Sequence, residues 1–121
     1  MLIRYKKTYE KIAMGLLSYM PGGLSVKMLQ EAIHIYETDD SWQLYLWKKD
    51  DDLIGLLGIE IGETTYTMHH ISINPSFRGE GIGKEMVMKL QLQFPEKECI
   101  STEDTEPFLQ KCTPKEEGAD Y

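Results

Sequence analysis

The chain is poor in cysteine and in long apolar runs, and each shortage excludes a class of protein. Its two cysteines, Cys99 and Cys112, stand close together near the end of the 121 residues. A bond between them would close only a small loop and could not staple a fold. We interpret both as free thiols, which is typical of a cytoplasmic protein. The basic start precedes no small-residue cleavage site, and no apolar run approaches the roughly 18 residues of a membrane span, so neither export nor membrane insertion is predicted.

Basic residues are also too few to give the chain a positive field. Thirteen lysines and arginines stand against twenty aspartates and glutamates, for a net charge of -7. Nucleic acid and anionic membranes are therefore poor partners. An anionic ligand would have to be held by local geometry, such as helix-terminal amides and a few placed cations. No carboxylate cluster has ligand spacing, so no metal site is predicted.

The apolar periodicity predicts one α/β domain over residues 1–112, followed by a polar tail over 113–121. Thr8 and Ser25 are the expected N-caps of the first two helices. Three consecutive strands joined by short turns form an antiparallel meander, and the whole order describes a mixed, mostly antiparallel sheet with helices on both faces. Strands are expected at 2–5, 43–48, 53–61, 65–73 and 97–101, and helices at 8–20, 26–37, 81–94 and 105–112.

The most informative segment joins the end of a strand to the glycine-rich start of a helix, from Ile71 to Lys84. Glycines at 79, 81 and 83 remove side chains that would keep a ligand from the backbone. Successive N–H groups can then point at phosphate oxygens at a helix N-terminus. Arg78 and Lys84 add cations for charge-assisted hydrogen bonds. The segment predicts a pyrophosphate cradle.

Two other phosphate-binding loops fit this segment less well. A P-loop needs four residues between its first glycine and the Gly-Lys pair, and a hydroxyl residue after the lysine. Here three residues separate Gly79 from Gly83, and Glu85 follows Lys84. A dinucleotide-binding fold needs G-x-G-x-x-G in an opening parallel unit, whereas this G-x-G-x-G follows an antiparallel meander.

Arg78, Gly81 and Gly83, after an apolar strand and an Asn-Pro turn, match the acyl-CoA signature R/Q-x-x-G-x-G/A. The segment resembles the GNAT family of N-acetyltransferases, and the predicted element order is also that of the family. The opening residues, and nearly the whole chain up to Cys112, further resemble the small RibT-type members encoded among riboflavin-biosynthesis genes of Bacillus-like bacteria. This resemblance implies acetyl-CoA as cosubstrate, a small-molecule amine or a protein lysine as acceptor, a cytoplasmic location and a link to riboflavin biosynthesis.

The resemblance also assigns cofactor-binding roles. Acetyl-CoA would enter the gap between strands 65–73 and 97–101, where backbone groups would hold the pantetheine arm and polarise the thioester carbonyl. Thr102 stands where many members carry an asparagine that contacts the cofactor. The expected cofactor-binding residues are Ile71, Ser72, Ile73, Arg78, Gly79, Glu80, Gly81, Ile82, Gly83, Lys84 and Thr102.

Three residues are candidates for the base that deprotonates the acceptor amine, unless a water takes that role. His69 is the nearest match to the family's base position. The strand's period of two sends His70 to the other face unless a bulge intervenes. Glu60, at the end of the preceding strand, is the third candidate. Plainer roles in packing or solvation also suit these residues, and packing is the expected role of Trp42 and Trp47.

The sequence departs from the family pattern in two places. Leu109 stands where members usually carry a tyrosine that protonates the departing thiolate. The chain is also expected to be C-terminally truncated, without the two strands that usually complete the sheet. The strand around Ile100 would then be an open edge, which a second copy of the chain or a riboflavin-pathway enzyme would cover. The alternative function is an acyl-CoA-binding accessory or regulatory module with little or no turnover.

Overall fold

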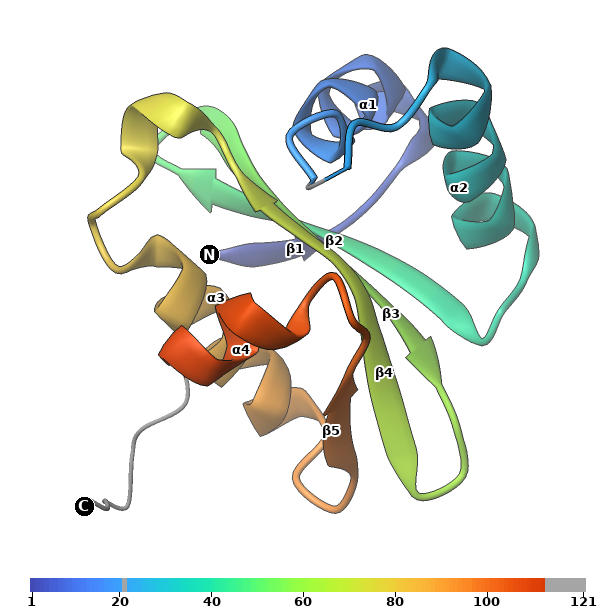
Figure 1. Cartoon of the computed structure of the whole chain (residues 1–121), viewed down its shortest axis with the longest axis vertical. Helices are drawn as coiled ribbons and strands as arrows, with labels where there is room; N and C mark the ends of the chain where they lie inside the picture. Colours follow the sequence, from blue (N-terminus) through green and yellow to red (C-terminus); the bar gives the residue numbers. More distant parts are fainter. Residues whose placement is uncertain (21, 113–121) are drawn as a thin grey trace.

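The computed structural model describes residues 1–20 and 22–112, and the predicted tail over 113–121 lies outside the described residues. The elements follow the predicted order (Figure 1). They are β1 (Leu2–Arg4), the short 3-10 helix η1 (Lys7–Tyr9), α1 (Glu10–Leu17), α2 (Val26–Thr38), β2 (Trp42–Lys49), β3 (Asp52–Ile61), β4 (Thr65–Ile73), the 3-10 helix η2 (Pro75–Phe77), α3 (Ile82–Gln93), β5 (Glu98–Ser101) and α4 (Glu106–Cys112).

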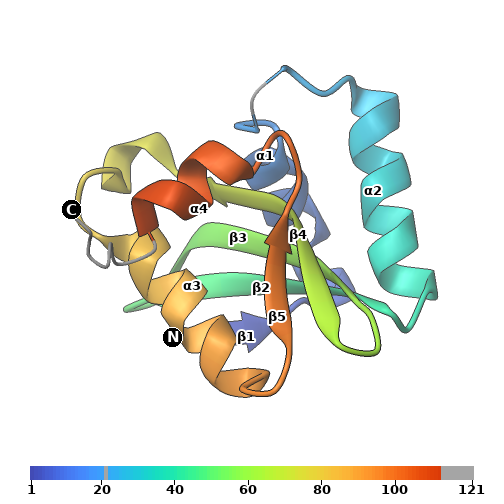
Figure 2. The ribbon, with the colours of Figure 1, turned by 60° about the horizontal axis from the view of Figure 1, so that its bottom comes forward.

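The described strands form one sheet in the order β1-β2-β3-β4-β5. Neighbouring strands are antiparallel except β4 and β5, which are parallel. Helices α1 and α2 cover one face of the sheet, and α3 and α4 cover the other (Figures 1 and 2). The predicted mixed sheet with helices on both faces is confirmed. None of the described helices is long and apolar enough to span a membrane.

The core has two halves because β3 is apolar toward both layers of helices. Leu56 belongs to the cluster under α1 and α2, whereas Leu57 and Ile59 belong to the cluster under α3 and α4. All three side chains are fully buried. This agrees with the expectation, drawn from its continuous apolar run, of a central strand covered on both sides.

One predicted N-cap is present and the other is wrong. Ser25 Oγ accepts a hydrogen bond from the Met28 amide at 3.2 Å, which is ordinary capping at the start of α2. Thr8 instead lies inside η1, and α1 starts after it at Glu10 without a side-chain cap. The reason is a tight turn in which the Tyr9 amide bonds the Lys6 carbonyl at 2.8 Å.

Strand β4 contains a bulge that sets the direction of both histidines. Gly58 of β3 pairs with His70, but the next residue, Ile59, pairs with Met68, so His69 has no partner in the ladder. Met68 packs on the α3 side, whereas His69 and His70 both contact residues of the α2 side, Trp42 and Tyr36. The bulge that was left open as the exception is therefore present, and His70 does not point to the face opposite His69.

Strands β4 and β5 part after a short parallel pairing. Their register runs from Thr65 opposite Glu98 to Met68 opposite Ser101, and β4 then continues to Ile73 without β5. At the point of separation the Thr105 hydroxyl donates to the Met68 carbonyl at 2.8 Å. The outer side of β4 beyond Met68 is thereby left open.

Candidate active site

The first part of the site is the start of α3. Gly79 and Gly81 have φ values of +84° and +79°, and a Cβ built on either would meet nothing within 4 Å. Gly81 precedes α3 and provides no side-chain cap. Among the described residues no hydrogen-bond acceptor is found for the amides of residues 82–84. These N–H groups are available to an anion at the positive end of the helix dipole.

Gly83 has a different role from the other two glycines. It is buried, and a Cβ there would collide with the ring of Phe108 in α4 and lie 3.0 Å from Cδ1 of Ile73. The missing side chain at Gly83 therefore lets α4 pack onto α3. This corrects the expectation that all three glycines open the backbone to a ligand.

The second part of the site is a cavity of about 690 Å³ that joins the start of α3 to β4. The Ile71 N–H points away from β3, toward the side of β4 that β5 no longer pairs with. It donates to Met20 Sδ at 3.3 Å. The Ile73 carbonyl on the same side accepts from Arg78 Nε at 3.2 Å. The cavity is lined by Tyr19, Ile71, Ser72, Ile73, Phe77, Arg78, Gly79, Gly81, Ile82, Gly83, Lys84 and Phe108.

Open amides at a helix start, continuous with a slot along an unpaired strand, suit a ligand with a pyrophosphate and an extended arm. That is the shape of the acetyl-CoA predicted from the sequence. The Ile71 amide and the Ile73 carbonyl are met by side chains, which can move aside, and not by a strand. The residues present therefore fit the group.

Among the predicted cofactor residues, the side chains of Glu80, Thr102 and Ser72 have other partners in this structure. Glu80 forms an ion pair with Lys49 at 2.8 Å. The Thr102 hydroxyl lies 3.2 Å from that of Thr105, in the turn before α4, and Thr102 does not line the cavity. The Ser72 hydroxyl is also engaged, because it donates to the Leu16 carbonyl at 2.6 Å.

The third part of the site is a group of side chains on the α2 face of the sheet, which we call the histidine cluster: His69, His70, Glu60, Trp42 and Tyr36. His69 Nε2 lies 3.0 Å from Glu60 Oε1, and the His69 ring stacks on Trp42 with centroids 4.3 Å apart. When the carboxylate accepts the Nε2 proton, Nδ1 of His69 keeps its lone pair. The side chain of His69 is 25% exposed, so a small molecule can reach it.

His70 lies deeper in the histidine cluster. Its Nδ1 is 2.7 Å from the hydroxyl of Tyr36 on α2. Burial lowers the pKa of His70 to about 4, the charge of His69 acts in the same direction, and Asp104 opposes it. Burial also raises the pKa of Tyr36, with a further contribution from Glu60. At neutral pH His70 is therefore uncharged and Tyr36 keeps its proton.

The structure thus brings together the three predicted base candidates, Glu60, His69 and His70. Trp42 was expected to serve packing alone and Tyr36 was not singled out. The hairpin register could have placed Trp42 there, because it pairs directly with Glu60. Tyr36 looks like any apolar position of α2, and the sequence holds no signal for its contact. Among the described residues, no group of His, Cys, Asp and Glu could hold a metal ion.

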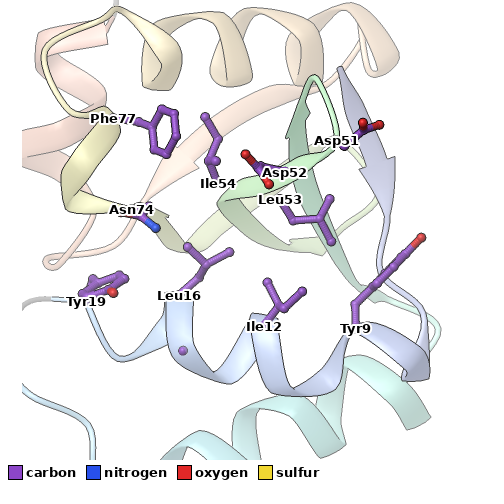
Figure 3. A pocket seen from close by; sticks show the side chains of 11 residues that line it. Tyr9, Ile12, Leu16, Tyr19, Asp51, Asp52, Leu53, Ile54, Asn74 and Phe77 are labelled. Carbon is purple, nitrogen blue, oxygen red and sulfur yellow. The ribbon is translucent and has the colours of Figure 1, made fainter.

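A separate groove of about 650 Å³ lies between α1 and the start of β3 (Figure 3). Its lining includes Ile12 of α1 and the carboxylates of Asp51 and Asp52. It shares only Tyr19 and Phe77 with the cavity beside β4. The groove contains none of the histidine cluster.

Comparisons with known proteins agree with this architecture. Residues 10–111 match the model of the Acetyltransferase (GNAT) family. An uncharacterized N-acetyltransferase in the lysA 3′ region of Bacillus methanolicus is 52% identical over 113 residues, which are 93% of this chain and 94% of that protein.

Solved structures show the same fold at low sequence identity. Aminoglycoside N-acetyltransferase AAC(6′)-Iy in complex with CoA superposes with a TM-score of 0.75 at 16% identity, over 100% of this chain and 88% of that one. A transcriptional regulator from Bacillus halodurans has a TM-score of 0.72 at 14% identity, over 100% and 95% of the two chains. Together with the family model, these matches show that the chain belongs to the acetyltransferase (GNAT) family, whose enzymes transfer acetyl groups from acetyl-CoA to amines.

Proposed function

We propose that this protein acetylates a primary amine by direct attack of the amine on the thioester of acetyl-CoA. The observation that carries the proposal is the continuity of the site. One cavity runs from the open amides of α3 to the outer side of β4 at Ile71, and the histidine cluster begins at the preceding residue of the same strand. The chain thereby offers an anion cradle, a slot for an arm and a candidate base in sequence along one strand.

The start of α3 would hold the pyrophosphate through the amides of residues 82–84, with Arg78 and Lys84 adding positive charge. The Ile71 amide would donate to the thioester carbonyl and stabilise the negative charge that develops on its oxygen. For that, the Met20 sulfur must leave the amide it accepts from now. Bound acetyl-CoA supplies the activated acetyl group.

An amine reaches the site mostly as an ammonium ion and must lose a proton before it can attack. We assign that step to Nδ1 of His69. Glu60 orients the ring through Nε2 and stabilises the imidazolium that forms, and Trp42 holds the ring plane. The carboxylates of Glu60 and Asp104 also favour a cationic acceptor near the histidine cluster.

Leu109 favours the second candidate function, an acyl-CoA-binding module with little turnover. It packs against the core under α3 and α4 and has no group that could donate a proton to a departing thiolate. In the enzymatic hypothesis that proton comes from solvent. The two functions differ in turnover and share the binding of acetyl-CoA.

A panel of primary amines, offered with acetyl-CoA and followed by release of free thiol, tests the proposal. We expect turnover with at least one amine and a fall of about tenfold to hundredfold in kcat for Glu60→Gln, without a change in the Kd of acetyl-CoA. Glu63→Gln is the matched control, because Glu63 lies in the exposed turn between β3 and β4. Binding of acetyl-CoA without turnover of any amine would establish the binding module instead.

Finer features of the function are also proposals. A cytoplasmic role near riboflavin biosynthesis is supported by the resemblance of the opening residues, and of nearly the whole chain up to Cys112, to RibT-type members. The lysA-linked relative adds nothing to it. In the described sheet β5 pairs with β4 alone, which leaves an edge that a homodimer or a riboflavin-pathway enzyme would cover. Light scattering over a dilution series should show a dimer of the isolated chain, and a strict monomer at all concentrations would contradict the homodimer.

A further inference from the structure

We propose that Tyr36 is a positioning residue for acetyl transfer, because its hydroxyl holds His70 as a neutral ring with the proton on Nε2. His70 then donates a hydrogen bond to an oxygen atom of the acceptor, while His69 takes the proton from the amine. The inference rests on the proposed function of the same site. It assigns the role of hydrogen-bond donor to His70 and the role of base to His69.

The contact between Tyr36 and His70 depends on a glycine of the strand between them. Tyr36 is 8% exposed, and its hydroxyl lies 2.7 Å from Nδ1 of His70. Gly58 pairs with His70 in the sheet, and a Cβ at Gly58 would collide with the Tyr36 hydroxyl. The ring of Tyr36 also has edge contacts with Trp42 and His70, at centroid distances of 5.7 and 5.6 Å. The absence of a side chain at Gly58 therefore leaves the space in which the Tyr36 hydroxyl meets His70.

The direction of the hydrogen bond follows from the groups around it. Tyr36 stays protonated because burial and the charge of Glu60 both raise its pKa. No other hydrogen-bond acceptor is found for the Tyr36 hydroxyl among the described residues, so we assign its proton to the contact with Nδ1 of His70, which places the ring proton on Nε2. Burial is the dominant cause of the low pKa of His70. Of the two charged groups that act on it, His69 lowers this pKa further and Asp104 raises it. His70 is thus a poor base at neutral pH.

Nε2 of His70 is the atom that can meet a ligand. No hydrogen-bond partner is found for it among the described residues. Among the described residues, Tyr66 Oη is the one fully buried side-chain polar atom that has no hydrogen-bond partner. Nε2 of His70 also has no partner, so it is not fully buried and retains access to solvent. A half-buried donor without a partner, beside the residue whose amide would polarise the thioester, is placed to bind an acceptor oxygen.

The separation of the two rings limits the class of acceptor. The centroids of His69 and His70 are 6.4 Å apart. One molecule can contact both rings if its nitrogen and an oxygen are separated by a few bonds. Glu60 and Asp104 favour a cation at this place. We therefore infer an acceptor amine that carries a hydroxyl or carbonyl oxygen close to its nitrogen, and not a plain alkylamine.

Long-range ¹H–¹⁵N correlation spectra of the histidine rings test the positioning without any substrate. We expect His70 to carry its proton on Nε2 in the unmodified protein and in Tyr45→Phe, and to become a mixture of tautomers in Tyr36→Phe. Tyr45 is a matched control because its buried hydroxyl also bonds a side chain, that of Gln43, at 2.5 Å. A proton on Nδ1 of His70, or an unchanged tautomer in Tyr36→Phe, would overturn the inference.

Kinetics with two amines then separate the donor from a base. With an amine that carries a nearby oxygen, kcat/KM should fall about tenfold in Tyr36→Phe and in His70→Leu, and should recover in His70→Gln, whose amide N–H can replace Nε2–H. With an alkylamine the three variants should differ little. Equal losses in His70→Gln and His70→Leu with both amines would make His70 the base and overturn the inference. Absence of turnover in the unmodified protein would instead refute the proposed function, while the spectra still decide the tautomer.

Discussion

His69 and His70 are neighbours in the sequence, and the fold gives them different surroundings. His69 is partly exposed, stacked on Trp42 and paired with Glu60. His70 lies deeper, with its Nδ1 against the hydroxyl of Tyr36. Both face the same side because the bulge at His69 adds a residue to one strand only. The two histidines in the sequence predicted candidate bases. The bulge determines on which face of the sheet their side chains lie.

The low pKa of His70 predicts a loss of stability in mild acid. The unfolded chain binds a proton at His70 below pH 6.5, whereas the folded chain binds it only below about pH 4. The contribution of His70 is therefore complete above pH 6.5 and is lost as the pH falls toward 4, by at most about 3 kcal/mol. Urea unfolding of the protein and of His70→Gln, at pH 7.5 and at pH 5, measures this difference.

We expect the free energy of unfolding to fall less between these two pH values in His70→Gln than in the unmodified protein. The other titrating groups that act on His70, namely His69 and Asp104, are the same in both proteins, so their effect cancels in the comparison. An equal pH dependence in the two proteins would contradict the assignment of a neutral, buried His70.

The start of α3 and the end of β4 were predictable as elements, and their contacts were not. The glycines at 79, 81 and 83 predicted a helix start that exposes its amides, and α3 begins at Ile82, one residue after the predicted start. The packing of Phe108 on Gly83 is a contact between distant segments that no local pattern contains. Thr102 was assigned by resemblance alone, and in the structure its hydroxyl contacts Thr105.

The turn after α1 contacts the amide that would polarise the thioester. Met20 Sδ accepts from the Ile71 N–H, and a thioether is a weak acceptor. Met20→Leu keeps a similar apolar volume and leaves the amide without this partner. We expect kcat/KM for acetyl-CoA to rise about twofold to fivefold, since no hydrogen bond has to be broken before the carbonyl binds. Initial rates at varied acetyl-CoA concentration measure the change.

Met14→Leu is the control for this substitution, because Met14 packs in the same cluster under α1 and α2. Among the described residues no hydrogen bond joins its sulfur to β4. Its kcat/KM should equal that of the unmodified protein. A lower kcat/KM in Met20→Leu, with Met14→Leu unaffected, would show that the sulfur supports the site and does not compete for the amide.

Considered as a whole, the molecule places the two proposed halves of its reaction on opposite faces of one sheet. Helices α3 and α4 lie on one face and α2 on the other (Figure 2). The cradle is at the start of α3, whereas the histidine cluster lies on the α2 face. The cavity beside β4 reaches Ile71, the residue that follows His70 in the chain. The net charge of -7 opposes the binding of any anion, so affinity for acetyl-CoA must come from the local amides and cations at the start of α3.

Calorimetric titration of acetyl-CoA into Gly81→Glu tests that central claim. A carboxylate at Gly81 would fill the open cradle and repel the pyrophosphate. Gly23→Glu is the matched control, because Gly23 is also exposed, has a φ of +63° and meets nothing within 4 Å of its Cβ position. Circular dichroism confirms folding of both variants. We predict at least about a hundredfold loss of affinity in Gly81→Glu and none in Gly23→Glu. Unchanged affinity in a folded Gly81→Glu protein would contradict the cradle, and with it the proposed path of acetyl-CoA along β4.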